Sequence, residues 1–230
     1  MREITVVDQS TLISDAEVQR VLVALQVQVD RDFAPAWGGL RALLLHAQHP
    51  PADGEVIYLV DDTSHANVLG YHDALPGEKP HGFVFVRTCI QHGEAWSATL
   101  SHEVLEQMAD PYTNTAALVT SLNGWPVAVA YEVCDPVEND EYTIDGVAVS
   151  NFVFPEWFED VWGRDSGKQF DFCGKVKEPF QLLKGCYADV YEGRHKGSPG
   201  GFKTIWGGEE HRKRKGRRRA FRQQSRPDND

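Results

Sequence analysis

Three ionisable side chains stand at helical spacing within the segment TLSHEVLEQMADP, residues 99–111: His102, Glu103 and Glu106, in the pattern His-Glu-x-x-Glu. On a helix, residues i and i+4 lie on one face, so His102 and Glu106 can bind the same ion. Glu103 is rotated by about 100° from His102 and can reach a water on that ion. The pattern predicts a metal-activated water with Glu103 as its general base, although zinc peptidases have His where this chain has Glu106.

A catalytic zinc ion usually has three protein ligands, so a third is expected downstream. Glu132, 26 residues after Glu106, is the first choice because a carboxylate inside an apolar run needs a partner. Asp135 is the second choice, and Cys134 is a weaker third. The predicted centre is one zinc ion, or another divalent metal, held by His102, Glu106 and either Glu132 or Asp135.

On a solvated face the same three residues would be ordinary polar surface, because His and Glu are common on helices. The rest of the helix is apolar, which predicts burial, and buried ionisable groups need a ligand or each other. The apolar helix residues are Trp96, Leu100, Val104, Leu105 and Met108. His72 is expected to be functionally silent, with a place in a substrate cleft as the alternative. Ser101 is a candidate for orienting His102.

The elements that position this helix follow from hydrophobic patterning. Ser14 and Glu17 form a capping box at the start of an amphipathic helix that reaches Phe33. The metal-bearing helix is expected over 94–109, ending before Asp110-Pro111. Asp145-Gly146 predicts the turn of a hairpin within 142–154. The expected strands are 4–7, 55–61, 69–73, 81–90, 118–122 and 127–133, with a further short element at 40–46.

Three segments together carry a resemblance to a known group of proteins. They are TLSHEVLE-x-x-x-DP at 99–111, YEVCDPVE at 131–138 and VSNFV at 149–153. With them the chain resembles, from about Ile4 to Phe158, a group of bacterial zincin-like proteins largely without an assigned function. The resemblance implies an α+β zincin-like fold, in which a twisted mixed sheet packs on the metal-bearing helix. It also implies that His102 and Glu106 are ligands and that Glu103 is the general base.

Composition and charge limit the class of protein, its domain organisation and its possible partners. The chain has 230 residues, of which 41% are hydrophobic and 25% charged, as in ordinary globular proteins. We expect a zincin-like domain over 1–160, an irregular Gly- and aromatic-rich extension of it over 161–208, and a basic, disordered tail over 209–230. The last 20 residues carry a net charge of +7 and the first 210 carry −18. The acidic body argues against nucleic acid as the main partner.

The expected cellular location depends on two kinds of apolar segment that the sequence does not contain. The N-terminus has no apolar signal-peptide core, and no apolar run reaches the length of a membrane span, so a cytoplasmic protein is expected. The four scattered cysteines are expected to be thiols rather than a disulfide framework.

The first functional hypothesis is a zinc-dependent, peptidase-like hydrolase acting on a peptide or protein. The alternative is a catalytically inactive zincin-like scaffold that works as an interaction module, recruited through its basic tail at 212–219. A third hypothesis is a nucleic-acid-associated protein anchored by that tail. The tail residues themselves do not choose between binding to nucleic acid or a membrane surface, docking on an acidic partner such as this chain's own acidic body, and a merely solubilising role.

Overall fold

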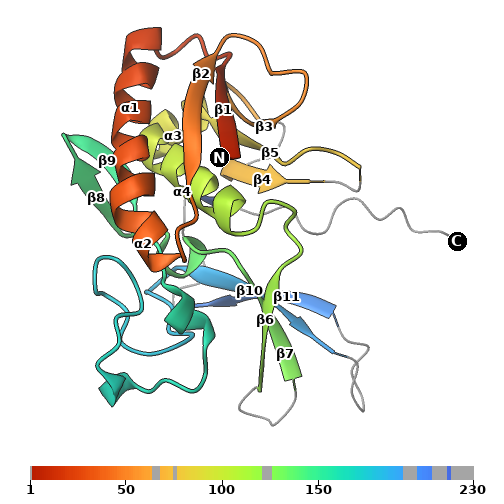
Figure 1. Ribbon diagram of the computed structural model, residues 1–230, viewed down its shortest axis with the longest axis vertical. Coiled ribbons are helices and arrows are strands. Elements are labelled where there is room, and N and C mark those ends of the chain that lie inside the picture. Colours follow the sequence, from red (N-terminus) through yellow and green to blue (C-terminus); the bar gives the residue numbers. More distant parts are fainter. Residues whose placement is uncertain are drawn as a thin grey trace, which may run out of the picture.

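The structure is a computed structural model that describes residues 2–63, 68–74, 77–120, 126–193 and 201–208, and the backbone of 217–218. Within these residues the chain forms three sheets and a small number of helices, which confirms the expected α+β class (Figure 1).

The largest sheet has six strands in the order β12-β4-β5-β3-β1-β2. Their bounds are β1 (Arg2–Asp8), β2 (Ala42–Ala47), β3 (Glu55–Val60), β4 (Val68–Asp73), β5 (His81–Phe85) and β12 (Arg217–Arg218). Strands β2, β1, β3 and β5 run parallel, whereas β4 is antiparallel to β5, so the sheet is mixed as expected. The backbone of β12 pairs in parallel with β4. The rest of the predicted tail, 209–216 and 219–230, lies outside the described residues.

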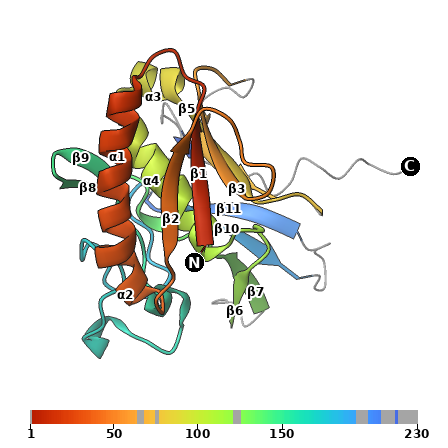
Figure 2. The same ribbon diagram turned by 45° about the horizontal axis from the view of Figure 1, so that its top comes forward.

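Two long helices, α1 (Asp15–Val27) and α4 (Trp96–Ala109), lie on the same side of this sheet (Figures 1 and 2). The predicted capping box is confirmed: the Ser14 hydroxyl accepts from the Glu17 amide at 3.3 Å, and the Glu17 carboxylate accepts from the Ser14 amide at 2.9 Å. The chain continues from α1 through the π-helical turn η1 (Gln28–Phe33) into α2 (Ala34–Ala36). The core between helices and sheet is built from aliphatic residues, among them Ile4, Val6, Leu25, Ile57, Leu59, Val84, Leu100 and Val104.

The predicted strand over 81–90 is half strand and half helix, which corrects that expectation. Strand β5 ends at Phe85, and α3 (Val86–His92) follows directly. Gly93 ends α3 with φ of 72°, and its amide donates to the carbonyls of Cys89 and Ile90. A continuous apolar run does not distinguish a buried strand from a buried helix, which is why the pattern was misleading here.

Helix α4 ends where Pro111 predicts, and its last carbonyls have a defined partner. The Arg2 guanidinium donates to the carbonyl oxygen of Gln107 at 2.6 Å and to that of Met108 at 2.9 Å, and it also pairs with Glu55. A cation at a helix C-terminus satisfies otherwise unbonded carbonyls and interacts favourably with the helix dipole. The first residues of β1 therefore fix the end of the helix that carries the candidate ligands.

A second sheet, of four strands in the order β11-β10-β7-β6, lies beyond the C-terminal end of α4 (Figure 1). A separate hairpin pairs β8 with β9, and the positive φ angles of Asp145 and Gly146 confirm its predicted turn. The bounds are β6 (Ala116–Thr120), β7 (Pro126–Ala130), β8 (Glu141–Ile144), β9 (Val147–Ser150), β10 (Tyr187–Glu192) and β11 (Gly201–Trp206). Strands β10 and β11 thus fall within the segment expected to be irregular. The short turns are η2 (Asp135–Val137), η3 (Pro155–Phe158) and η4 (Arg164–Ser166).

A buried hydrogen-bond network ties α4 to the hairpin. The Ser101 hydroxyl donates to the side-chain oxygen of Gln28 at 2.7 Å and accepts from the Ser150 amide at 3.0 Å. Gln28 in turn donates to the Ser150 carbonyl at 2.9 Å. Ser101 therefore anchors the helix to β9, and its hydroxyl bonds to Gln28 and Ser150 rather than orienting His102 as the sequence had suggested.

Two further expectations concern cysteines and membrane spans. All four cysteines lie within the described residues, and none forms a disulfide. Among the helices of the described chain, none combines the length and apolar character that crossing a bilayer requires.

Candidate metal centre

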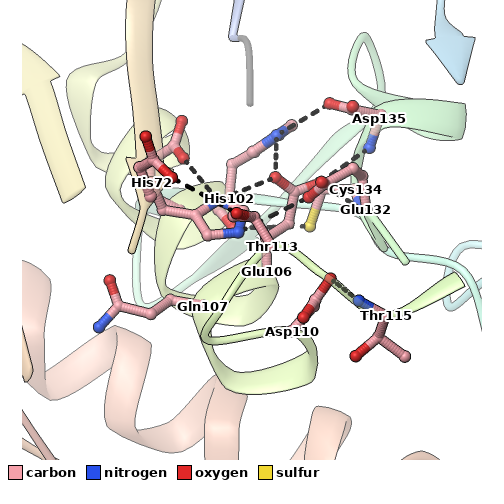
Figure 3. Close-up of polar contacts among 12 residues, drawn as sticks. His72, His102, Glu106, Gln107, Asp110, Thr113, Thr115, Glu132, Cys134 and Asp135 are labelled. Carbon is pink, nitrogen blue, oxygen red and sulfur yellow. Dashed lines mark hydrogen bonds and ion pairs between the residues drawn. The ribbon is translucent and has the colours of Figure 1, made fainter. Parts of the chain in front are cut away.

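Helix α4 presents the motif residues to the protein interior. His102, Glu103 and Glu106 are each only 1% exposed, which confirms the prediction of a buried helix. The spacing places His102 Nε2 3.1 Å from Glu106 Oε2, one turn away on the same face. Three ionisable residues in a buried helix require compensation, and the compensating groups come from two other elements (Figure 3).

The segment after β7 supplies the acidic groups on the His102 side. Asp135 Oδ1 lies 3.2 Å from His102 Nε2, at the start of the turn η2. The other oxygen of Glu106, Oε1, accepts from the backbone amides of Cys134 at 3.0 Å and Asp135 at 3.3 Å. Glu106 therefore positions the turn that carries Asp135. Of the two carboxylates expected to complete this site, the ion-pair distances place Asp135, the second choice, beside His102.

Glu132, the first choice, lies beside a different imidazole. Its Oε2 is 3.7 Å from Nε2 of His72, a β4 residue with no exposed surface. His72 Nδ1 faces Glu103 Oε2 at 3.5 Å and Glu106 Oε2 at 3.7 Å. Sequence reasoning gave His72 no ligand role. The available clue was a histidine within the apolar strand sequence VLGYHD, two residues after Gly70 and hence on the same face of the strand.

The weaker third option, Cys134, also belongs to this neighbourhood. Its thiol donates to the His102 carbonyl at 3.9 Å. Its sulfur also lies within 4.8 Å of one donor atom of His102 and one of Glu106. Tyr187, at the start of β10, was not foreseen because its segment was expected to be irregular. Burial, together with the charge of Asp135, raises the pKa of its phenol well above the ordinary value.

The electrostatics of this cluster are dominated by the negative charges of its buried carboxylates. Burial raises the pKa of Glu106, and the charge of Glu132 raises it further. Burial and the charge of Glu106 likewise raise the pKa of Asp135, against the lowering effect of His102. Burial alone would lower the pKa of His72, but the surrounding carboxylates outweigh it and raise the pKa to about 9. Ionising these buried carboxylates together is therefore costly in free energy.

Several donor atoms of the cluster make no hydrogen bond to the described part of the chain, although they are buried. They are both ring nitrogens of His72 and of His102, Glu103 Oε1 and both carboxylate oxygens of Asp135. Ligand atoms about 2.1 Å from one zinc ion at tetrahedral angles are separated by about 3.4 Å. The separations of 3.1 and 3.2 Å around His102 Nε2 are close to that value. Imidazole and carboxylate donors suit divalent ions such as zinc, so the residues fit a metal.

Glycine at position 70 allows this close approach of β4 to α4. A Cβ atom there would lie 2.7 Å from Glu103 Oε1, 2.8 Å from the Phe83 carbonyl oxygen and 2.9 Å from Thr99 Cγ2. Gly70→Ala is expected to lower the free energy of unfolding by about 1–3 kcal/mol, because overpacking forces the helix and strand apart. Urea unfolding measures the change.

Gly163→Ala is the matched control for that substitution. The corresponding Cβ would meet nothing within 4 Å, and the φ of Gly163 is −113°, which other residues adopt. Equal stability of the two alanine variants would contradict the tight contact between Gly70 and Glu103.

Comparison of the chain with protein-family models, with curated proteins and with solved structures finds no match. The chemistry of the cluster is therefore the basis on which a function is proposed.

Proposed function

We propose that this protein is a metal-dependent hydrolase of zincin-like fold, with zinc as the metal and a peptide or related carbonyl compound as substrate. The observation that carries the proposal is the set formed by His102, Glu106 and Asp135, with Glu103 adjacent on the same helix. Three nitrogen and oxygen ligands with a carboxylate base beside them are the protein components of a hydrolytic zinc site.

The zincin-like part of the proposal rests on the sequence resemblance, and the arrangement around the cluster is compatible with it. A mixed sheet packs on α4, and its antiparallel strand β4 runs next to the metal-bearing helix. That arrangement agrees with what the sequence resemblance at 99–111 and 131–158 implies.

The roles of the residues follow from their positions. A bound divalent ion would lower the pKa of a water molecule and polarise a substrate carbonyl. His102, Glu106 and Asp135 would hold the ion, and the two backbone amides on Glu106 fix the direction of its carboxylate. Glu103 would accept the proton of the attacking water. Glu106 brings more negative charge than histidine does, which would weaken the ion as a Lewis acid and raise the pKa of its water, so the proposal is stated as a hydrolase and not as a protease.

A second candidate is a scaffold in which the ion is structural and the protein acts by interaction. The burial of the cluster favours it, because no residue among His72, His102, Glu103, Glu106, Glu132 and Asp135 exceeds 2% exposure. Structural zinc sites are closed, whereas catalytic sites keep one position open to water and substrate. Both candidates include a bound metal ion, and they differ in whether the function of the protein requires Glu103.

The test of the metal itself is its content in protein purified without chelators or a polyhistidine tag. Plasma mass spectrometry should find at least one equivalent of zinc in the wild type and at least one equivalent less in His102→Ala. Absence of metal from both proteins, with the variant merely less stable, would overturn the proposal and leave a buried polar network. His81→Ala is the control, because His81 lies on β5 with its Nδ1 near the Lys79 carbonyl.

A further inference from the structure

The donor atoms of the cluster divide into two groups that share one residue. His102, Glu106 and Cys134 form one group, and His72, Glu106 and Glu132 form the other; within each group the donor atoms lie within 4.8 Å of one another. Asp135 lies beside the first group, with a carboxylate oxygen 3.2 Å from His102 Nε2. Each group therefore has its own imidazole with a second carboxylate near it, and Glu106 is common to both.

Glu106 is oriented to serve both groups at once. Its Oε2 faces His102 Nε2 at 3.1 Å and His72 Nδ1 at 3.7 Å. Its Oε1 is held by the amides of Cys134 and Asp135, so the carboxylate does not turn toward either side. A carboxylate oxygen that faces two imidazoles can be a ligand of two ions at once, and in two-metal sites both ions act on one reaction.

Charge balance favours the same arrangement. The cluster contains four carboxylates, Glu103, Glu106, Glu132 and Asp135, and two imidazoles, all at most 2% exposed. The two positive charges of one divalent ion do not match four carboxylates, and uncompensated carboxylates in the protein interior are costly. Two divalent ions neutralise the four carboxylates. Imidazoles and carboxylates are also the ligands of two-metal carboxylate centres built within helical bundles.

We propose that the cluster holds two divalent cations with Glu106 as their shared ligand. His102 and Asp135 hold the first ion, and His72 and Glu132 hold the second. The first ion is the one in the proposed function, on which this inference rests; the second is additional to it.

Metal stoichiometry tests the inference and separates its failure from that of the proposed function. Metal-free full-length protein is equilibrated with zinc alone, and bound zinc is counted per chain after gel filtration. Two equivalents are expected in the wild type and one in His72→Ala. One equivalent in the wild type would overturn the second ion and leave the proposed function standing, whereas none would overturn both.

A third group, partly exposed at the surface through Asp15, requires a matched control. Asp8, Asp15 and His46 also bring three donor atoms within 4.8 Å, and Asp15 is exposed. His46→Ala should leave the stoichiometry at two. If His46→Ala lost an equivalent and His72→Ala did not, the second ion would belong to this surface group and the inference would be wrong.

A spectroscopic measurement on the wild-type protein gives a test that does not depend on the folding of any variant. Two manganese(II) ions bridged by the Glu106 carboxylate are magnetically coupled, so the electron paramagnetic resonance spectrum of manganese-loaded protein should be that of a coupled pair. Glu132→Gln, which keeps the shape of the side chain, should restore the signal of an isolated ion. Signals of isolated ions at full loading of the wild type would contradict a shared ligand.

Discussion

Glu103→Gln is expected to lower turnover of a peptide substrate by about 10²–10⁴-fold while bound metal and thermal stability stay close to wild type. The amide keeps the shape of the side chain but does not accept the proton of the attacking water. Glu103 is adjacent to the ligands without being one of the three proposed for the first ion. Hydrolysis of a mixed fluorogenic peptide library by zinc-loaded protein measures the effect.

Glu94→Gln is the matched control, since Glu94 is exposed and precedes α4. It should retain full turnover. Wild-type protein that binds zinc but hydrolyses no peptide, together with a Glu103→Gln variant that behaves identically in every assay, would favour the scaffold candidate over the hydrolase.

Removal of divalent metal is expected to lower the free energy of unfolding by about 4 kcal/mol relative to protein at a free metal concentration about 1,000 times Kd. A bound ion would stabilise only the folded chain, where side chains from β4, α4 and the segment after β7 converge (Figure 3), and it would compensate the buried carboxylates. Thermal unfolding with and without chelator measures the loss. Equal stability of chelated and metal-loaded protein would contradict a buried metal centre of either kind.

The effect of metal removal should depend on pH in a defined direction. Glu106 and Asp135 have raised pKa values in the metal-free fold, so the folded chain binds more protons than the unfolded chain above their ordinary pKa values. His72, raised to about 9 from 6.5, acts in the same direction between those two values. The stability of the metal-free protein therefore falls as the pH rises from about 5 to about 9. A bound metal would replace these protons and would therefore bind more tightly at higher pH.

The gap in melting temperature between metal-loaded and chelated protein should accordingly widen from about pH 5.5 to about pH 8.5. Calorimetric scans of both forms at a few pH values suffice to measure it. A metal-free protein that gains stability over this range would show that the carboxylates are compensated by groups other than a metal.

Local patterns were sufficient for the elements whose geometry depends on near neighbours. The capping box of Ser14 and Glu17, the end of α4 before Pro111 and the turn at Asp145-Gly146 each involve residues at most a few positions apart. The convergence of His102 and Glu106 is of the same kind, because helical geometry alone sets the separation of residues i and i+4. The metal hypothesis could therefore be stated from this one helix.

Contacts between segments that lie far apart in the sequence could not be derived from local patterns. His72 reaches the cluster because β4 reverses direction against β5 and, with Gly70 lacking a side chain, lies directly against α4. The choice between Glu132 and Asp135 depends on how the segment after β7 turns onto the amide-bound carboxylate of Glu106. Strand order, register and the packing of one element on another decide these positions.

The amino-acid order alone places an imidazole and a carboxylate one turn apart, with a second carboxylate between them, on an apolar helix that must be buried. The partners of these groups follow from the packing of the chain, which brings His72 from β4 and Glu132 and Asp135 from the segment after β7 to the same buried volume. Side chains spaced along a helix are placed by local backbone geometry, whereas groups far apart in the chain meet only when the sheets and helices pack.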